Sequence, residues 1–431
     1  MNVPLLDLVA QYRAIKDEVL PAVTGVIESQ QFIMGAAVAQ LEAAVARLSH
    51  ARHGIGCASG TDALLLPLKT LDLKIKDEVL PAVTGVIESQ QFIMGAAVAQ
   101  LEAAVARLSH ARHGIGCASG TDALLLPLKT LDLKPGDEVI TTAFTFFATA
   151  GTIHNAGGTP VFVDIDPDTF NIEPAAVEAA VTPRTRALLP VHLFGQMANV
   201  ERLLGTAAKY GVPVIEDACQ AIGARRQVAG AWRMAGELGR VGAYSFFPSK
   251  NLGGWGDGGM IVTSDDAAAE RLRRLRLHGG AKQYHHDEIG TNSRLDTLQA
   301  AVLLAKLPHL APWSAKRREH AAYYTQALAG LPPVRPPVVD PCNEHIFHQY
   351  TLRVERRDAL QAHLTAKGIG NAVYYPIPLH RQPCFASLGY REGSLPASEQ
   401  TAREVISLPI YPELTRAQLD TVIGAIHEFY R

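Results

Sequence analysis

The chain lacks the features that mark membrane, secreted and nucleic-acid-binding proteins. No apolar run reaches the roughly 18 residues that a membrane span requires, and the first residues lack the basic and apolar parts of a targeting segment. The formal net charge is only −2 with both signs interspersed, which argues against nucleic acid or a membrane surface as a partner. The five cysteines show no CxxC or Cys/His ligand spacing, which predicts reduced thiols in a cytoplasm and no metal site. A small-molecule partner is therefore expected.

What the chain has instead is an internal duplication. Residues 15–74 (copy one) and 75–134 (copy two) are identical. Solenoid proteins normally need three or more stacked units, whereas this block occurs twice and stops. The apolar segment at 54–57, repeated at 114–117, is typical of one strand in a buried sheet, and two identical strands cannot occupy one position. We therefore expect an enzyme of about 371 residues (431 − 60) with one copy extruded or loosely packed.

From residue 135 onward, short β-branched segments alternate with helical ones. Strands are expected at 138–142, 160–164, 186–192, 212–216, 241–247 and 259–263, and helices at 173–181, 200–210 and 265–277, the last with Ser264 as N-cap. This alternation predicts an α/β fold, in which helices cover both faces of a mostly parallel sheet.

The rhythm changes after Leu295, where a long helical region runs to Ala329 and a Pro-rich stretch follows. We expect a large domain over 1–310 and a smaller C-terminal α/β domain over 311–431. The smaller domain is expected to have strands at 345–354 and 371–375 and helices at 357–367 and 415–430.

Ligands of open α/β sheets bind beyond the carboxyl ends of the strands. One such place is the small-residue turn at 118–122, where Gly120 and Thr121 precede a helix. Free backbone N–H groups at a helix N-terminus suit a phosphate, although a plain N-cap explains the turn equally well. The glycines at 114, 116 and 120 nearly match a dinucleotide fingerprint, but the third is one position late and no acidic residue follows at the required distance. A nicotinamide oxidoreductase is therefore a poor alternative.

Three further strand ends carry an acid, a lysine and aromatic rings. Asp217 and Gln220 lie three apart on one face of an expected helix start, and Asp217 is either an N-cap or a buried carboxylate that faces a cationic ring nitrogen. Lys250 follows a strand in a glycine-rich turn; most such lysines are solvated, but one held beside a cationic cofactor is partly neutral and able to form a Schiff base. Phe146 belongs to an aromatic cluster at 144–147 that core packing mostly explains, although one ring could stack on a flat cofactor.

Six motifs, taken in order, resemble a known family. They are Ser-Gly-Thr-Asp-Ala-Leu at 119–124, Pro-Gly-Asp-Glu-Val-Ile-Thr-Thr at 135–142, Val-Ile-Glu-Asp-Ala-Cys-Gln at 214–220, Ser-Phe-Phe-Pro-Ser-Lys-Asn-Leu-Gly at 245–253, Asn-Ser-Arg-Leu-Asp at 292–296 and Tyr-Tyr-Pro-Ile-Pro-Leu-His at 374–380. This set resembles the pyridoxal-phosphate-dependent nucleotide-sugar aminotransferases of the DegT/DnrJ/StrS type, along the whole chain except the extra copy.

The resemblance implies a fold-type I aminotransferase with pyridoxal 5′-phosphate as cofactor. An amino acid, by family analogy L-glutamate, would give its amino group to a nucleotide-linked keto-sugar, for the biosynthesis of amino sugars, polysaccharides or glycosides. Some relatives have histidine in place of the lysine and catalyse dehydration, so Lys250 favours amine transfer.

The resemblance also assigns roles around the cofactor ring. Lys250 would bind the cofactor covalently and later move the proton between the amino-acid α-carbon and the cofactor. Asp217 would pair with the pyridinium nitrogen and make the ring an electron sink. Gln220 would lie near the ring and its 3-hydroxyl group, with Phe146 stacked on the opposite side.

The remaining assignments concern the phosphate and the substrates. Ser245 and the backbone of Gly120 and Thr121 would hold the phosphate, and Asn292 would contact the phosphate of a second subunit, which implies a homodimer with shared active sites. A final set resembles positions that contact the donor carboxylate or the sugar nucleotide, although a structural role is equally expected for them: Arg294, Tyr375 and His380.

Only one copy of the repeat can supply the phosphate turn. Copy two runs directly into the strand at 138–142, which favours Gly120 and Thr121 over Gly60 and Thr61 of copy one. A hybrid of the two copies stays open, because looping out the intervening residues costs only ~3–4 kcal/mol of chain entropy. Two competing outcomes also stay open: a chain that the repeat leaves misassembled and inactive, and another reaction on the same cofactor, such as racemisation or elimination.

Overall fold

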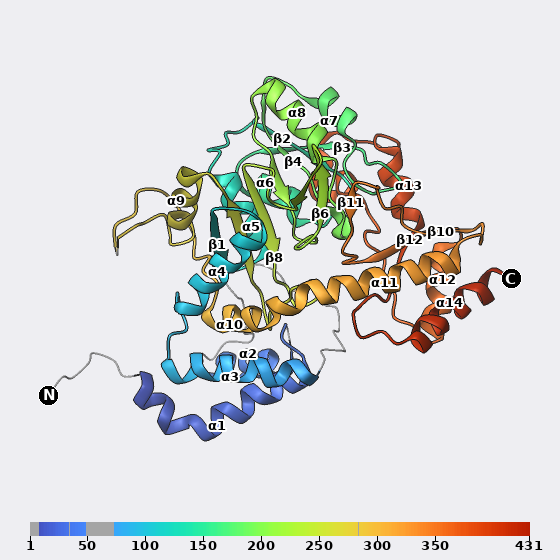
Figure 1. Ribbon diagram of the computed structural model, residues 1–431. Helices are drawn as coiled ribbons and strands as arrows, with labels where there is room; N and C mark the ends of the chain where they lie inside the picture. Colours follow the sequence, from blue (N-terminus) through green and yellow to red (C-terminus); the bar gives the residue numbers. More distant parts are fainter. Residues whose placement is uncertain (1–7, 34, 49–72, 283) are drawn as a thin grey trace.

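The centre of the protein is a twisted sheet, seen in the upper half of the ribbon in Figure 1. The computed structural model describes residues 8–33, 35–48, 73–282 and 284–431. Four strands are hydrogen-bonded in the order β1 (His113–Cys117), β9 (Gly259–Thr263), β8 (Val241–Ser245) and β5 (Ile215–Asp217). Three more follow the order β3 (Thr159–Val163), β2 (Glu138–Thr142) and β4 (Thr185–Leu189).

The two groups of strands form one continuous layer. Parallel bridges from Leu188 to Val214 and from Val191 to Asp217 join the β4 side to the β5 side. Among these strands only β9 runs antiparallel to its neighbours. The predicted mostly parallel sheet is therefore confirmed, and the carboxyl ends of β1, β8 and β5 meet at one edge.

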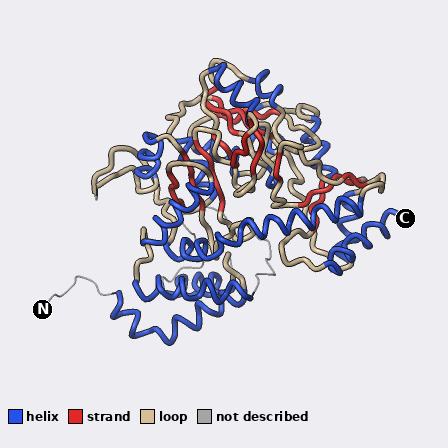
Figure 2. The backbone as a smooth tube through the Cα atoms, viewed as in Figure 1, coloured by secondary structure: helices blue, strands red, loops and turns tan. Residues whose placement is uncertain are grey.

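Helices cover both faces of this sheet, as Figure 2 shows in blue around the red strands. Alternate residues of β8 explain why: Ala243 packs into a core with the first group of helices, and Tyr244 packs into a different core with the second. The first group, on the Ala243 face, contains α5 (Gly120–Lys129) and α9 (Asp266–Leu275). The second, on the Tyr244 face, contains α4 (Ala96–Leu108) and α10 (Thr297–Lys306).

The helices around β2, β3 and β4 are α6 (Ala148–Asn155), α7 (Pro174–Ala180) and α8 (Val200–Tyr210). The prediction for 200–210 matches α8, which Asn199 caps at its start and left-handed Gly211 ends. The predicted N-cap of α9 was wrong. Asp265 caps this helix by accepting a hydrogen bond from the Ala268 N–H, while the Ser264 hydroxyl accepts one from the Arg112 N–H instead.

The C-terminal part of the chain has its own apolar core. An antiparallel sheet of β10 (Val334–Arg335), β12 (Tyr350–Val354) and β13 (Val405–Leu408) packs with α11 (Leu310–Leu328), α12 (Arg357–Ala366) and α14 (Arg416–Tyr430). Other elements are α13 (Pro396–Glu404) and a small sheet of β11 (Asn343–Glu344), β6 (Arg225–Val228) and β7 (Ala231–Met234). The domain division at residue 310 stays a prediction.

Three expectations in this region need correction. The helical region after Leu295 is divided into α10 and α11 by a 3₁₀ turn at Leu307–His309, because Pro308 has no N–H group to continue the helix. The expected strand at 345–354 is regular only over β12. The expected strand at 371–375 makes a single bridge, from Ala372 to Ser407.

The two copies of the repeat have different environments. Copy one spans most of α1 (Leu8–Ser29) and all of α2 (Ala36–Leu48), and copy two spans most of α3 (Leu73–Ser89) and all of α4, β1 and α5. The helices α1 and α3, drawn in blue, lie below α10 in Figure 1, outside the central sheet. Leu101 of copy two is 0% exposed, whereas Leu41, its counterpart in copy one, is 64% exposed. The sequence-identical helices therefore form in both copies but bury their apolar residues to different extents.

The described part of copy one contacts the rest of the chain through apolar side chains. Leu20 packs against a small core that includes Val79 and Val83 of α3. The Phe32 ring stacks on Trp255, with ring centroids 5.5 Å apart. Gly60 and Thr61 lie outside the described residues, so the turn that the structure shows before α5 is that of copy two.

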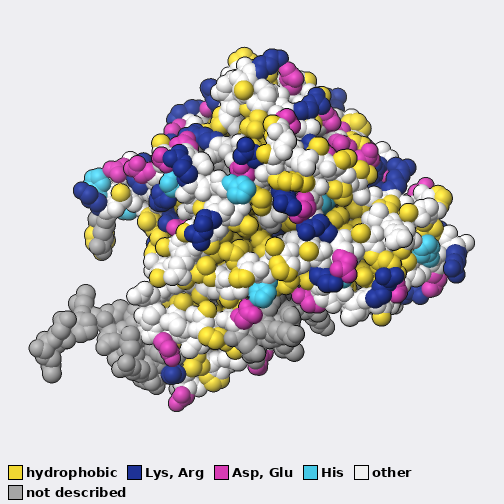
Figure 3. Space-filling model, viewed as in Figure 1, with side chains coloured by type: hydrophobic (Ala, Val, Ile, Leu, Met, Phe, Trp, Pro, Cys, Tyr) yellow, Lys and Arg dark blue, Asp and Glu magenta, His cyan; other side chains and the backbone are white. Residues whose placement is uncertain are grey.

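The distribution of surface charge and the character of the helices bear on the partners that the protein can have. Figure 3 shows acidic and basic side chains interspersed over the visible face rather than gathered by sign. Across the described ranges, no helix is both long and apolar enough to cross a membrane.

Candidate functional site

The carboxyl ends of three strands bring predicted site residues together. Asp217 is the last residue of β5, and Ser245 is the last of β8. Gly120 lies so close to Ser245 that a Cβ atom on this glycine would be 2.5 Å from the serine Cβ. The Cys219 thiol donates a long hydrogen bond to the Gly120 carbonyl (3.9 Å), which connects the Asp217 turn to the same place. The structure thus assembles one site from copy two, β5 and β8.

The turn before α5 has the geometry of an anion cradle. Ser119 caps the helix, because its hydroxyl accepts a hydrogen bond from the Asp122 N–H at 3.1 Å. Gly120 and Thr121 are the first two residues of α5, and N–H groups at these positions have no acceptor within the helix. Both interpretations of this turn are thus compatible, since the N-cap is present and it leaves N–H groups free for a phosphate.

Asp217 is a buried carboxylate rather than a helix cap. No α-helix begins there among the described residues; residues 218–224 form turns, so the expected helix start was wrong. One carboxylate oxygen, Oδ2, accepts a hydrogen bond from the Thr149 hydroxyl at 2.8 Å. The other, Oδ1, accepts one from the Cys219 N–H at 3.2 Å. The side chain is 4% exposed, and two donors compensate the burial of its charge.

Gln220 connects this carboxylate turn to the C-terminal part of the chain. Its side-chain oxygen accepts a hydrogen bond from the Phe194 N–H at 2.8 Å, and its side-chain nitrogen donates to the Tyr375 hydroxyl at 2.9 Å. Burial raises the pKa of Tyr375, so this phenol stays protonated. The Tyr375 ring lies 6.3 Å from the half-exposed ring of Phe146. Tyr375, 155 residues after Gln220, is therefore part of the same site.

Lys250 lies in the turn that follows β8. Its backbone N–H donates to the Phe247 carbonyl at 2.8 Å. Burial lowers the pKa of its ammonium group, while the neighbouring Cys219 and Asp217 act in the opposite direction. More of this amine is consequently neutral near pH 7 than of a solvated lysine, which is the form that attacks carbonyl compounds.

Helix α10 holds the glycine-rich turn after Lys250. The buried Lys306 ammonium donates to the Gly253 carbonyl at 2.8 Å. Gln299 accepts from the Trp255 N–H at 2.7 Å and donates to the Trp255 carbonyl at 3.1 Å. Sequence reasoning missed Lys306, Gln299 and Thr149. The available signal for the first two was a lysine and a glutamine within a helix that is otherwise largely apolar.

Three predicted residues are not joined to this cluster by a contact in the described structure. Asn292 is exposed, and its neighbour Ser293 donates to the Asp122 carboxylate at 2.7 Å. The guanidinium Nε of Arg294 is buried without a partner among the described residues. His380 is buried, and its Nε2 lies 3.0 Å from a Glu399 carboxylate oxygen, a geometry that favours a structural role. The substrate and partner contacts assigned to these residues stay predictions.

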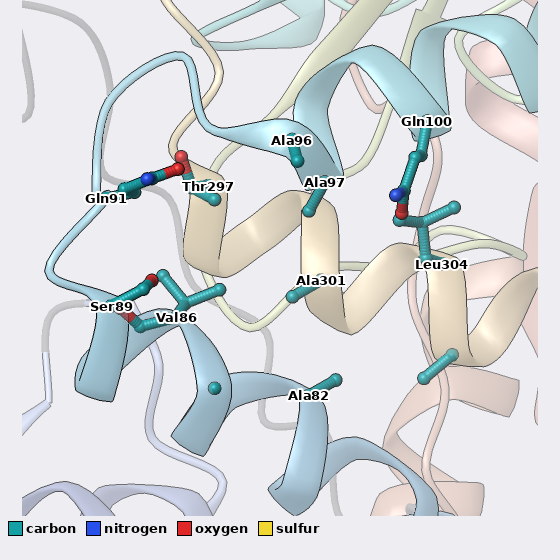
Figure 4. A pocket seen from close by; sticks show the side chains of 12 residues that line it. Ala82, Val86, Ser89, Gln91, Ala96, Ala97, Gln100, Thr297, Ala301 and Leu304 are labelled. Carbon is teal, nitrogen blue, oxygen red and sulfur yellow. Dashed lines mark hydrogen bonds between the residues drawn. The ribbon is translucent and has the colours of Figure 1, made fainter.

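A cavity of about 470 Å³ lies elsewhere, between α3, α4 and α10 (Figure 4). Small side chains such as Ala82, Ala97 and Ala301 face it, together with Ser89 and Gln91. None of its lining residues carries an ionisable side chain, and none belongs to the cluster around Asp217 and Lys250. This cavity therefore offers no group for acid–base or carbonyl chemistry, unlike the cluster at the strand ends.

Comparison with known proteins gives a consistent result. A family model described as the DegT/DnrJ/EryC1/StrS aminotransferase family matches residues 13–84 and again 75–427. The first match ends within the second copy, as expected if both copies resemble the start of the same model.

Individual relatives align with nearly their full length. The chain is 54% identical over 361 residues to the pleiotropic regulatory protein of Geobacillus stearothermophilus, covering 83% of this chain and 96% of that protein. It is 46% identical over 352 residues to the UDP-N-acetyl-3-dehydro-alpha-D-glucosamine 3-aminotransferase of Acidithiobacillus ferrooxidans, covering 82% and 94%. This chain is covered less completely than its relatives, as expected if one copy has no counterpart in them.

Solved structures show the same similarity. S. venezuelae DesV has a TM-score of 0.80 at 44% identity, with 83% of this chain and 95% of that chain covered. NtdA from Bacillus subtilis, solved with bound cofactor PMP, has a TM-score of 0.77 at 32% identity, with 84% and 83% covered.

Proposed function

Because the chain belongs to the DegT/DnrJ/EryC1/StrS aminotransferase family, we propose that it transfers an amino group from an amino acid to a nucleotide-linked keto-sugar, with pyridoxal 5′-phosphate as cofactor. Lys250 beside the buried carboxylate of Asp217 is the observation that carries this proposal. L-glutamate is the proposed donor, and amino-sugar or polysaccharide biosynthesis is the proposed context. Relatives named as aminotransferases of UDP- and dTDP-linked sugars support the substrate class.

The residues present fit this cofactor. The close approach of Gly120 to Ser245 leaves no room for a Cβ atom, which indicates a backbone cradle that a larger residue would fill. Free N–H groups at the start of α5 complement the phosphate charge. Asp217, with two hydrogen-bond donors, is suited to hold a proton on a ring nitrogen. When bound, the cofactor supplies an aldehyde that condenses with amines and a ring that withdraws electrons.

The residues around the proposed cofactor site then have distinct roles. The Lys250 amine, whose pKa burial lowers, would hold the cofactor covalently and would then carry on Nζ the proton that moves to and from the α-carbon of the donor. Asp217 keeps a cationic nitrogen protonated by charge pairing. Gln220 and Tyr375 form one hydrogen-bonded wall, and the half-exposed Phe146 ring lies next to Tyr375 and is suited to stacking on a flat ring.

We also propose that the enzyme is a cytoplasmic homodimer in which Asn292 reaches the phosphate of the other subunit. The exposure of Asn292 at the end of a loop supports this arrangement. Four cysteines of the described ranges, at 117, 219, 342 and 384, are free thiols, in keeping with a reducing compartment.

The test combines cofactor binding with turnover. Purified protein incubated with the cofactor is expected to gain a visible absorbance that L-glutamate abolishes, and borohydride reduction is expected to label Lys250. Lys306 is the internal control, because it is a buried lysine whose pKa is likewise lowered by burial, to about 8. Labelling at Lys306 alone, or turnover that survives Lys250→Ala, would contradict the proposal.

The substrate class needs a separate assay. A panel of UDP- and dTDP-linked keto-sugars is incubated with glutamate, and keto-sugar-dependent formation of 2-oxoglutarate is measured. Without any keto-sugar, glutamate that is racemised, or consumed beyond one equivalent per active site, would instead indicate racemisation or elimination.

A further inference from the structure

We propose that Thr149 is a positioning residue that keeps Asp217 ionised and directed toward the ring nitrogen of the cofactor. This inference rests on the pairing of Asp217 with that nitrogen under the proposed function. The observation that carries it is a buried chain of two hydroxyl groups that ends on the carboxylate.

The two hydroxyl groups lie close together and are shielded from water. Thr149, the second residue of α6, is 1% exposed, and its Oγ1 lies 2.8 Å from Asp217 Oδ2. The Thr145 hydroxyl lies 3.1 Å from the Thr149 hydroxyl and is also buried. Thr145 belongs to the segment between β2 and α6. The two hydroxyl groups therefore connect this segment, which carries the aromatic cluster at 144–147, to the end of β5.

The direction of these hydrogen bonds follows from counting hydrogens. An ionised carboxylate only accepts, so the single hydroxyl hydrogen of Thr149 must point at Asp217. The Thr149 oxygen is then free to accept the hydroxyl hydrogen of Thr145. Each threonine is thus a donor with a fixed orientation as long as Asp217 is charged.

Loss of the Thr149 hydroxyl would change where the proton between Asp217 and the ring nitrogen lies. Of the two donors that the protein supplies, Asp217 would then keep only the Cys219 N–H, so the buried carboxylate would be less well compensated and would more readily take the proton from the ring nitrogen. A protonated Asp217 no longer stabilises a cation, so the ring nitrogen would lose its proton and much of its electron-withdrawing power.

The experiment follows the ring nitrogen directly in the holoenzyme. Cofactor labelled with ¹⁵N at the ring nitrogen is bound to wild type and to Thr149→Val, Thr149→Ala and Thr149→Ser, and its NMR shift is recorded. Valine has nearly the shape of threonine, and alanine removes the hydroxyl without adding a methyl group. The wild type and the serine variant are expected to show a protonated nitrogen, and the other two to move toward the unprotonated shift.

A matched control is available on the same helix. Thr152 is also 1% exposed, but within the described part of the chain its hydroxyl bonds only to the Ala148 and Thr149 carbonyl groups, at 2.8 and 3.2 Å. Thr152→Val should therefore keep the wild-type nitrogen shift. In the half-reaction with glutamate, Thr149→Val is expected to be roughly 10- to 100-fold slower, the range for loss of one hydrogen bond to a charged group, and Thr152→Val near wild type.

The outcomes distinguish a failure of the Asp217–ring pairing from a failure of the Thr149 role alone. An unprotonated nitrogen in the wild type overturns the pairing of Asp217 with the ring and this inference with it. A protonated nitrogen that stays protonated in both the valine and the alanine variants of Thr149 overturns the positioning role alone. Equal losses in Thr149→Val and Thr152→Val assign both threonines to folding, which also overturns it.

Discussion

Gly120 and Ser245 approach each other more closely than two side chains could. Alanine at 120 would place its Cβ 2.5 Å from the Ser245 Cβ and 2.7 Å from its hydroxyl oxygen. The hydroxyl could rotate away, but the Ser245 Cβ is fixed to the backbone, so the turn or β8 must move. This contact defines the width of the proposed phosphate cradle.

The repeat provides an internal control for this residue. We expect Gly120→Ala to weaken cofactor binding at least ~10-fold, because the displaced turn no longer directs its N–H groups at the phosphate. Gly60→Ala, the same change in the same local sequence of copy one, should leave the affinity unchanged. Absorbance titration of the apo protein measures both. A loss confined to Gly60→Ala would show that copy one supplies the cradle.

At the level of elements, helices α2 and α4 have the same sequence and the same length but different neighbours. Leu101 of α4 lies in the core on the Tyr244 face of the sheet, and Leu41 of α2 is largely exposed. Intrinsic helix propensity is equal in the two, so any difference between them comes from packing.

This pair predicts a difference that can be measured by denaturant unfolding. Leu101→Ala is expected to destabilise the protein by about 2–5 kcal/mol, since it opens a cavity in a packed core. Leu41→Ala is expected to change the stability by less than about 0.5 kcal/mol, as for most surface substitutions. Equal and small effects at both positions would mean that either copy can occupy the place of α4.

How far the sequence predicts these elements depends on what determines each one. The strands at 138–142 and 259–263 are buried along their length and flanked by turn residues, so their bounds could be predicted. The turn after Asp217 could not be predicted, because its conformation depends on contacts with Thr149 and Tyr375, which are distant in sequence. The same reason explains why Thr149 was missed, since nothing in its local sequence indicates that it faces a carboxylate.

For the whole molecule, the extra copy raises the question of assembly. Deleting residues 15–74 or 75–134 gives the same 371-residue chain (431 − 60), so every difference between that chain and the full one arises from having two copies. In the described structure, copy one contributes no residue to the proposed site. Its clearest contact with the catalytic part is the stack of Phe32 on Trp255, which follows Lys250 in the glycine-rich turn.

We expect the 371-residue chain to fold and to bind one cofactor per chain, with an unfolding midpoint equal to or above that of the full chain. The reason is that deletion removes apolar surface such as Leu41, while the copy that remains still supplies the sequence of β1. Size-exclusion chromatography with cofactor absorbance measures assembly and occupancy together, and both chains should elute as dimers. In the full chain, Phe32→Ala breaks the contact with Trp255 while keeping the length. A shorter chain that cannot bind cofactor, while the full chain can, would show that both copies are needed for the site.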